Sequence, residues 1–271
     1  MAEQSAPRVS FDEQLVLFRY FLHEFGVNSL DELGRKLNSA ELEGETEAGG
    51  TYFCEYLLRL CGGSGTVPAE KLRLYDENIC RHTHRIGEKR SGIRWKYFQY
   101  LALLFTERYL DRYFSDAEDF CRDLNVWMQE KAREARGGIA FAPYTPERLN
   151  RLAFMCATGS GKTLLMHVHI LQFLHYFGRA RQRNSRLSLN RVIVLAPNEE
   201  MSRQHLEELV CSSIPASLFE KGGSFLAARE QVLVIDINKL KDEGRVKTVS
   251  VDSFEQNNLV LIDEGHRGLS G

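Results

Sequence analysis

The sequence predicts an α/β fold, in which a parallel β-sheet with flanking helices follows a mainly α-helical region. Up to about residue 140, apolar residues recur at helical spacing and no strand-like alternation stands out. After Pro146, short β-branched runs alternate with helical stretches, which is typical of parallel α/β architecture. A chain of 271 residues is long enough for about two domains. We therefore place a helical region at residues 1–140 and a sheet-forming domain at residues 141–271.

The helical region is predicted from the spacing of its apolar residues. Residues 11–25 keep the helical period, and a capping box beginning at Ser29 starts a second helix. A short helix is expected over 52–60, between two polar, glycine-rich loops. A strongly helical stretch spans 93–135, where Ser115 is the candidate cap between two helices. Its aromatic stripe is more typical of core packing than of a base-stacking surface.

Four apolar runs in the second domain predict parallel strands, at residues 152–156, 191–195, 231–237 and 258–262. Helical patterns follow the first two runs, at 162–177 and 199–210. The runs are apolar on both faces, so we expect helices to cover both sides of the sheet.

Composition limits the partners and the compartment. The net charge of −2 gives no overall attraction to nucleic acid, so any such contact needs a local basic patch. Six cysteines without a C-x-x-C pair favour reduced thiols in a cytosolic protein. The amino terminus has no signal pattern, and no apolar run is long enough to span a bilayer. We expect a cytoplasmic protein with no membrane partner.

A glycine-rich loop between the run at 152–156 and the next helix carries the most specific pattern. In such a turn, backbone N–H groups and the positive helix end bind phosphate oxygens. Lys162 would reach the β- and γ-phosphates of ATP, and the Thr163 hydroxyl would bind Mg²⁺. The pattern G-x-x-x-x-G-K-[ST] fits except that Cys156 replaces the first glycine. The predicted cofactor contacts are Thr158, Gly159, Ser160, Gly161, Lys162 and Thr163.

A second motif, Asp263-Glu264-Gly265-His266, follows the last apolar run. An acid at the carboxyl end of such a strand can hold the Mg²⁺ that bridges the phosphates, which is the role predicted for Asp263. Glu264 can accept a proton from a water in line with the γ-phosphate, so Glu264 and Lys162 are the candidate catalytic residues. The alternative is two surface acids after a strand. A P-loop kinase is disfavoured, since many kinases have only the first carboxylate.

Together these motifs resemble motifs I and II of superfamily 2 DEAD/DEAH-type helicases and translocases. More narrowly, residues 97–113 and 258–268 resemble the ATP-dependent subunit of type III restriction endonucleases. Residues 195–198, with Gln204 downstream, resemble motif Ia. The resemblance implies an incomplete P-loop, RecA-like sheet, ATP and Mg²⁺ as cofactors, and ATP hydrolysis by Mg-assisted attack of water. The implied partners are nucleic acid, here double-stranded DNA, and a methyltransferase or specificity subunit.

The same resemblance implies roles for residues outside the loop. In motif Ia, Pro197 and Asn198 would hold the nucleic-acid backbone. His266 would link the phosphate site to the nucleic-acid-binding side, with an ordinary loop histidine as the alternative. Gln99 resembles the glutamine that reads adenine upstream of motif I, although such an amide can also cap a helix.

Two basic segments are candidate contacts to nucleic-acid phosphates. Arginines after the helix at 162–177 should lie at the edge of the sheet opposite the nucleotide and complement the negative helix end; they are Arg179, Arg181, Arg183 and Arg186. The segment 81–96 is a better candidate for such a contact than the first, but a solvated loop is favoured there; its basic residues are Arg85, Lys89, Arg90, Arg94 and Lys96. Within the same stretch, strand-like spacing could suggest zinc ligands, but neighbouring arginines favour a loop; these residues are Cys80, His82 and His84.

Later helicase motifs, and a second RecA-like domain with its arginine fingers, do not occur in this sequence. We therefore expect residues 141–271 to form the first part of the ATPase domain, truncated after motif II, and this chain alone to hydrolyse ATP negligibly. The leading interpretation is the ATP-binding part of an ATP-dependent nucleic-acid helicase or translocase of the type III restriction kind. The alternative is a nucleotide-binding or interaction module without turnover.

Overall fold

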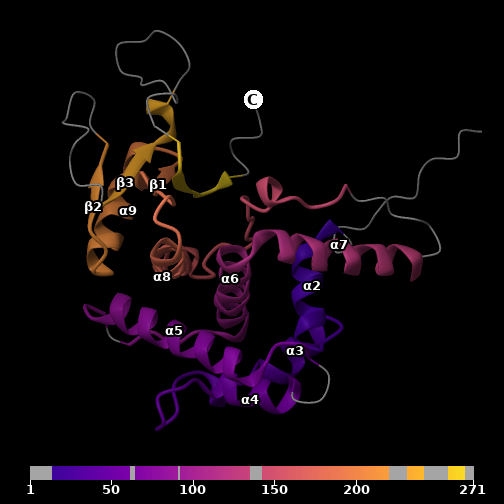
Figure 1. Ribbon diagram of the computed structural model, residues 1–271. Helices are drawn as coiled ribbons and strands as arrows, with labels where there is room; N and C mark the ends of the chain where they lie inside the picture. The colour runs from indigo at the N-terminus through magenta and orange to yellow at the C-terminus, as the bar shows by residue number, and fades with distance from the viewer. Residues whose placement is uncertain are drawn as a thin grey trace, which may run out of the picture. The chain divides into compact units, whose positions relative to one another are not determined.

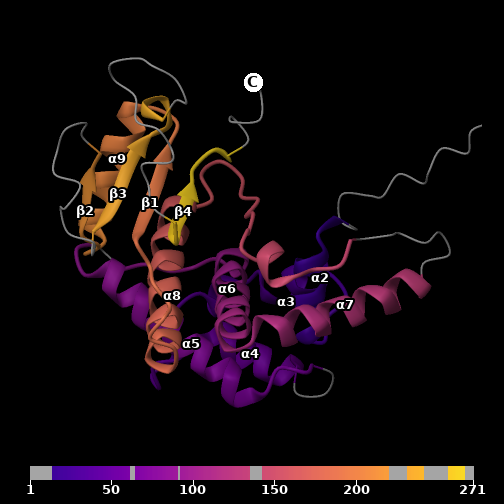
Figure 2. The same ribbon diagram turned by 45° about the horizontal axis from the view of Figure 1, so that its top comes forward.

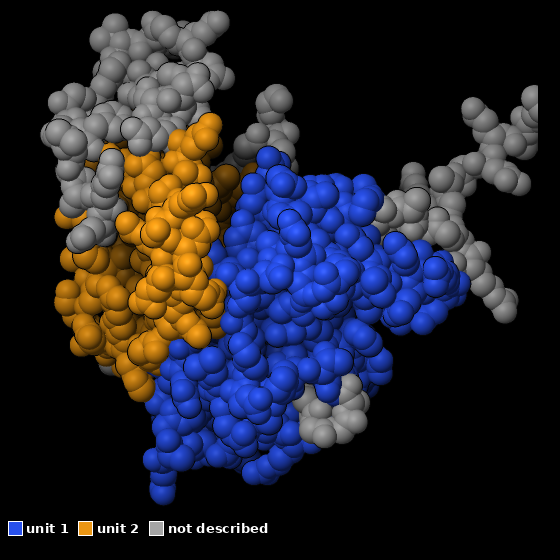
Figure 3. Space-filling view, viewed as in Figure 1, with its two compact units in different colours: residues 1–80, 94–157 blue, residues 81–93, 158–271 orange. Residues whose placement is uncertain are grey.

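The computed structural model describes residues 14–61, 65–90, 92–134, 142–219, 231–240 and 256–265. The chain divides into two compact units (Figure 3). Unit 1 comprises residues 1–80 and 94–157, and unit 2 comprises residues 81–93 and 158–271. No helix in these described ranges is long and apolar enough to cross a membrane.

Unit 1 is built from helices (Figure 1). In chain order they are α2 (Val16–Glu24), α3 (Leu30–Leu37), η1 (Ala40–Leu42), α4 (Tyr52–Cys61), the first part of α5 (Ala69–Gly87), α6 (Tyr97–Ser115), α7 (Ala117–Glu134) and η2 (Pro146–Arg148). Aromatic rings fill the core, and Tyr100 stacks on Phe53 with ring centroids 5.1 Å apart. The aromatic stripe of α6 is confirmed as core packing, except for Phe98, which is 41% exposed.

Two helix starts in unit 1 follow from short polar side chains. Ser29 Oγ accepts a hydrogen bond from the Glu32 N–H at 3.2 Å, so the predicted cap of α3 is confirmed. The predicted cap at Ser115 is wrong, because Ser115 is the last residue of α6. The Asp116 carboxylate takes this role and accepts a hydrogen bond from the Asp119 N–H at 2.9 Å. A carboxylate also complements the positive end of α7 better than a hydroxyl does.

Helix α5 replaces the first part of the loop expected over 81–96, because it extends from Ala69 to Gly87. The described residues between Gly87 and the start of the next helix form no helix or strand, as expected for a loop. Its buried face carries Leu72, Tyr75, Ile79 and Ile86, which keep the helical period. Polar residues are buried on the same helix, and they mask this period in the sequence; they are Asp76, Asn78, His82 and Thr83. Cys80, His82 and His84 lie on this helix and so lack the strand spacing on which the zinc alternative depended. No group of three metal-binding side chains occurs within the described ranges.

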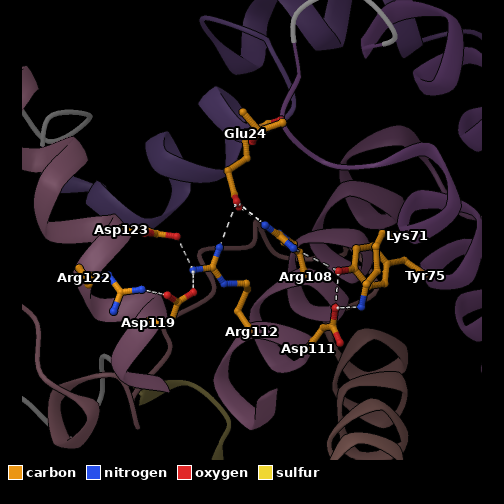
Figure 4. Close-up of polar contacts among 10 residues, drawn as sticks. Glu24, Lys71, Tyr75, Arg108, Asp111, Arg112, Asp119, Arg122 and Asp123 are labelled. Atoms are coloured by element: carbon orange, nitrogen blue, oxygen red, sulfur yellow. Dashed lines mark hydrogen bonds and ion pairs between the residues drawn. The ribbon is translucent and has the colours of Figure 1, made fainter. Parts of the chain in front are cut away.

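A network of charges, buried around Glu24 and Arg108, joins α2, α6 and α7 in unit 1 (Figure 4). Glu24 and Arg108 are only 4% and 8% exposed, and the Arg108 guanidinium donates two hydrogen bonds to the Glu24 carboxylate. Arg112 lies 3.7 Å from the same carboxylate and donates to Asp123 at 2.7 Å. Because neither member of a buried pair can be solvated alone, each depends on the other for its charge.

Unit 2 contains a parallel sheet, whose described strands run in the order β2-β3-β1-β4 (Figure 2). Its elements are α8 (Lys162–Arg183), β1 (Arg191–Ala196), α9 (Glu199–Cys211), β2 (Ala216–Leu218), β3 (Val232–Asp236), η3 (Ile237–Lys239) and β4 (Asn258–Ile262). In the middle of β1, Val194 pairs with Val234 on one side and Leu261 on the other. The α/β class and three of the predicted strands are thus confirmed. β2 was not predicted, because its three residues form no apolar run.

The strand predicted at 152–156 is wrong, because this segment has no strand structure and lies outside the sheet of the described residues. A strand is stabilised by ladder hydrogen bonds to a neighbour, so an apolar run alone does not produce one. Phe154 and Met155 are 47% and 74% exposed. The expectation that every strand is covered also fails for β4, where Val260 and Ile262 are 46% and 58% exposed.

Buried histidines distinguish unit 2. His167 is fully buried on α8, and its Nδ1 lies 2.8 Å from the Ser212 Oγ. Burial, aided by the positive charge of Arg90, lowers the pKa of His167 to about 3. Burial likewise lowers the pKa of His82 to about 3. Both rings are therefore neutral in the folded protein at neutral pH.

Replacing His167 with glutamine is expected to make the protein less sensitive to acid. Unfolded His167 binds a proton below a pH of about 6.5, whereas the folded residue does so only near pH 3. The stability that it supports is therefore complete above pH 6.5 and is lost as the pH falls toward 3. Between pH 8 and pH 5, the variant should lose about 2 kcal/mol less unfolding free energy than the wild type.

Urea unfolding at the two pH values measures this difference. His23→Gln is the control, since solvent reaches the His23 ring in the folded protein. Equal losses of stability in His167→Gln and the wild type would contradict the assignment of His167 as a buried neutral ring.

Candidate functional site

The glycine-rich loop leads directly into α8. Gly161 is the N-cap with a φ of 81°, and Gly159 has a φ of 75°, a conformation that glycine adopts without the strain of a side chain. A Cβ added to Gly159 would meet nothing within 4 Å, so backbone conformation and not crowding explains this glycine. The first turn of α8 carries no acidic residue. Its N–H groups and helix dipole therefore favour an anion at this end.

Lys162 and Glu264 meet in the structure although they are 102 residues apart in the chain. The Lys162 Nζ donates a hydrogen bond to the Glu264 Oε1 at 2.9 Å. The two side chains are 33% and 25% exposed, so both remain open to solvent. Glu264 also has a φ of 52°, in the left-handed region that ends β4 with a turn. The structure thus brings together the two residues predicted to be catalytic.

Asp263 lies beside this pair at the carboxyl end of β4. Its N–H donates to the Leu195 carbonyl at 3.0 Å, which continues the pairing of β4 with β1. Its Oδ1 accepts from the Glu264 N–H at 3.0 Å, and its Oδ2 lies 3.0 Å from the His205 Nε2. The hydrogen bond with His205, together with the Lys162 charge, lowers the pKa of Asp263. The carboxylate is therefore ionised at neutral pH.

Comparison with known proteins decides the family. The sequence model of the family described as "Type III restriction enzyme, res subunit" matches residues 116–271, more than half of the chain. The chain belongs to this res subunit family. Searches of curated proteins and of solved structures found no match. As a member of the res subunit family, the chain has an ATP-dependent, helicase-like domain, and its parallel sheet fits an incomplete RecA-like fold.

The res subunit family implies ATP and Mg²⁺ in general, and the residues of this site fit both. The start of α8 offers backbone N–H groups and the Lys162 ammonium, which suit phosphate oxygens. Asp263 offers an ionised carboxylate, a hard oxygen ligand of the kind that Mg²⁺ prefers. Thr163 follows Lys162 in the first turn of α8, and its side chain is half-buried.

His205 is a site residue that the sequence analysis missed. It lies on α9, and its side chain is only 3% exposed. The buried residues of this helix are Ser202, His205 and Leu209, so helical periodicity marks the inner face of α9. That signal was present in the sequence. The neighbouring Gln204, named in the motif Ia resemblance, is exposed and lies on the outer face of α9.

The remaining predicted contacts have partners within the protein. Asn198 is the N-cap of α9, where its Oδ1 accepts from the Met201 N–H at 2.9 Å. The Pro197 carbonyl accepts from the Asn238 Nδ2 at 3.1 Å. The Gln99 Oε1 accepts from the Lys96 N–H at 2.7 Å, which is the helix-capping alternative. The adenine role of Gln99 stays a prediction, and His266 lies outside the described residues.

Basic residues of the segment 81–93 bind carbonyl groups at and just after the end of α9. Arg85 lies on α5, whereas Lys89 and Arg90 lie in the non-helical stretch that follows it. Arg85 donates to the Ser213 carbonyl at 3.4 Å, and Lys89 donates to the Val210 carbonyl at 3.1 Å. Arg90 donates to the Glu208 carbonyl at 3.3 Å and forms an ion pair with the Glu208 carboxylate. Cations at a helix carboxyl end offset the negative end of its dipole. Helix α8 continues past its predicted end at 177 to Arg183. Arg181 and Arg183 therefore lie in its last turn and not after it, where they offset the negative helix end as expected.

Proposed function

We propose that this chain is the ATP-binding part of an ATP-dependent helicase or translocase of the type III restriction kind, acting on double-stranded DNA. The contact between Lys162 and Glu264, with Asp263 adjacent, is the observation that carries this proposal. It joins a phosphate-binding lysine to the two acids that motor chemistry needs. The alternative of two surface acids after a strand does not account for the contact between Glu264 and the first residue of α8.

Each residue has a distinct role in the proposal. Backbone N–H groups of Thr158 to Gly161 and the Lys162 ammonium bind phosphate oxygens, while Thr163 and Asp263 hold Mg²⁺. When bound, the metal neutralises charge on the phosphates. Glu264 accepts a proton from the attacking water. Because Lys162 now pairs with Glu264, phosphate binding would draw the lysine away and leave the carboxylate ready to act as a base.

Support for a nucleic-acid partner comes from the family and from the edge of the sheet. Pro197 and Asn198 follow the carboxyl end of β1, and Asp263 follows the carboxyl end of the neighbouring β4. The Asp263 N–H donates to the Leu195 carbonyl, so the two segments leave the sheet at the same edge. We propose that this motif Ia segment lies along a nucleic-acid backbone, that His266 couples that contact to ATP, and that a methyltransferase or specificity subunit supplies sequence recognition.

Lys162→Met tests the proposal through nucleotide binding, which does not require turnover. Losing a charge-assisted hydrogen bond to phosphate costs about 1.5–3 kcal/mol, so the Kd for Mg-ATP should rise about 10- to 100-fold. Isothermal titration calorimetry measures that constant. Lys131→Met is the matched control, because Lys131 pairs with Glu134 on α7.

Wild-type protein that does not bind Mg-ATP would refute the proposed function. The same holds if Lys162→Met binds Mg-ATP as tightly as Lys131→Met does. A tenfold loss confined to Lys162→Met would support the assignment of the loop.

A second candidate function is a nucleotide-binding or interaction module without turnover. This candidate would apply if the pairing of Lys162 with Glu264 persisted when the nucleotide binds, because Lys162 would then not move to the phosphates. Nucleic-acid-stimulated ATP hydrolysis that depends on Glu264 would decide against this candidate.

A further inference from the structure

We infer that His205 is a positioning residue that fixes the Asp263 carboxylate for binding of Mg²⁺. The inference rests on the proposed function, because it assigns a further residue to the same site. Its basis is the contact between the His205 Nε2 and the Asp263 Oδ2, 3.0 Å apart and 58 residues apart in the chain. An ionised carboxylate can only accept hydrogen bonds, so the Nε2 carries the proton.

The hydrogen bonds of Asp263 leave a defined part of the carboxylate open. Its Oδ1 accepts from the Glu264 N–H, and its Oδ2 accepts from His205. Each oxygen has about two lone-pair positions, so one on each oxygen remains for a cation. Two donors on two different oxygens also hold the plane of the carboxylate. Without His205, the carboxylate could rotate about its own side-chain bonds.

The histidine ring is itself held in place. Its Nδ1 is buried and makes no hydrogen bond within the described part of the chain, so the contact with Asp263 is the one that orients the ring. Helix α9 is capped by Asn198 at its start. At its end, Lys89 and Arg90 bind its last carbonyls. A side chain on an anchored helix can orient a ligand more exactly than one on a loop.

His205 differs from His167 in a way that makes a matched comparison. Both rings are buried in unit 2, with 2% and 0% exposure. His167 contacts Ser212, whereas His205 contacts Asp263. Replacing either ring removes a buried polar group, but only His205 should affect the metal. Loss of a group that orients a metal ligand typically lowers the affinity for the metal about 10- to 100-fold.

The test is the affinity for Mn²⁺ in the presence of a non-hydrolysable ATP analogue. Electron paramagnetic resonance measures the free Mn²⁺. His205→Leu should weaken Mn²⁺ binding about tenfold or more. His205→Gln should bind within about threefold of the wild type, because its amide can donate from a similar position. His167→Leu should bind Mn²⁺ as the wild type does. Binding of the analogue without metal should be unchanged in all variants.

The outcomes separate this inference from the function on which it rests. Wild-type protein that binds neither the analogue nor Mn²⁺ refutes the proposed function and the role of His205 with it. Wild-type affinity in folded His205→Leu refutes the role of His205 alone. If His205→Leu does not fold, His205→Asn replaces it, since its shorter side chain keeps the amide but cannot reach Asp263. Equal Mn²⁺ affinity in His205→Asn and His205→Gln would then overturn the inference.

Discussion

Glu264→Gln is expected to lower nucleic-acid-stimulated ATP turnover about 10²- to 10⁴-fold, the range for losing a general base. The amide keeps the size of the side chain and can still accept a hydrogen bond from Lys162, but it cannot take a proton from water. Binding of Mg-ATP should therefore persist while hydrolysis is lost. The steady-state rate of phosphate release, with and without double-stranded DNA, measures the effect.

The assay includes double-stranded DNA because the proposed motor acts on that partner. Glu200→Gln is the matched control, because Glu200 is an exposed acid in the first turn of α9. Turnover in Glu264→Gln equal to that of Glu200→Gln would remove Glu264 from the mechanism. Loss of Mg-ATP binding in Glu264→Gln would show instead that the residue serves the phosphate loop.

Arg108→Met is expected to destabilise unit 1 by about 3–5 kcal/mol, the cost of leaving a buried charge without its partner. Glu24 is 4% exposed and takes two hydrogen bonds from Arg108, so water cannot replace the lost guanidinium. Arg112, 3.7 Å from Glu24, offsets part of the loss and places the expected value toward the lower end. Urea unfolding of the variant and the wild type measures the difference.

Arg122→Met provides the control for Arg108→Met. Arg122 also forms an ion pair, with Asp119, but its side chain is 67% exposed. Exposed pairs contribute about 0–1 kcal/mol, so this change should have little effect. Combining Arg108→Met with Glu24→Gln should recover part of the stability, because the unpaired charge is then gone. Equal effects of Arg108→Met and Arg122→Met would mean that the buried pair adds nothing specific.

Local signals predicted much of the fold and of the site. β1, β3 and β4 are apolar runs, and Ser29 caps α3 through a contact within its own turn. The glycine-rich loop is likewise a local pattern, since the positive φ of Gly159 and Gly161 depends only on their own backbone. The acids after β4 were recognised because they follow a strand directly.

Features that depend on distant contacts could not be predicted in this way. The segment 152–156 is apolar enough for a strand, yet a strand also requires a hydrogen-bonded neighbour. Helix α5 buries polar residues whose partners lie far away in the chain. The Asp76 carboxylate, for example, accepts hydrogen bonds from the hydroxyl groups of Thr51 and Tyr100. The proposed role of His205 depends on its contact with Asp263, which is 58 residues away in the chain.

The pairing of Lys162 with Glu264 bears on the order in which ligands bind. The charges of Lys162 and Glu264 offset each other, so Asp263 is left as a single carboxylate to attract a lone divalent cation. The cation should therefore arrive together with the nucleotide, whose phosphates supply most of its ligands. Nucleotide and cation then raise each other's affinity by the same factor.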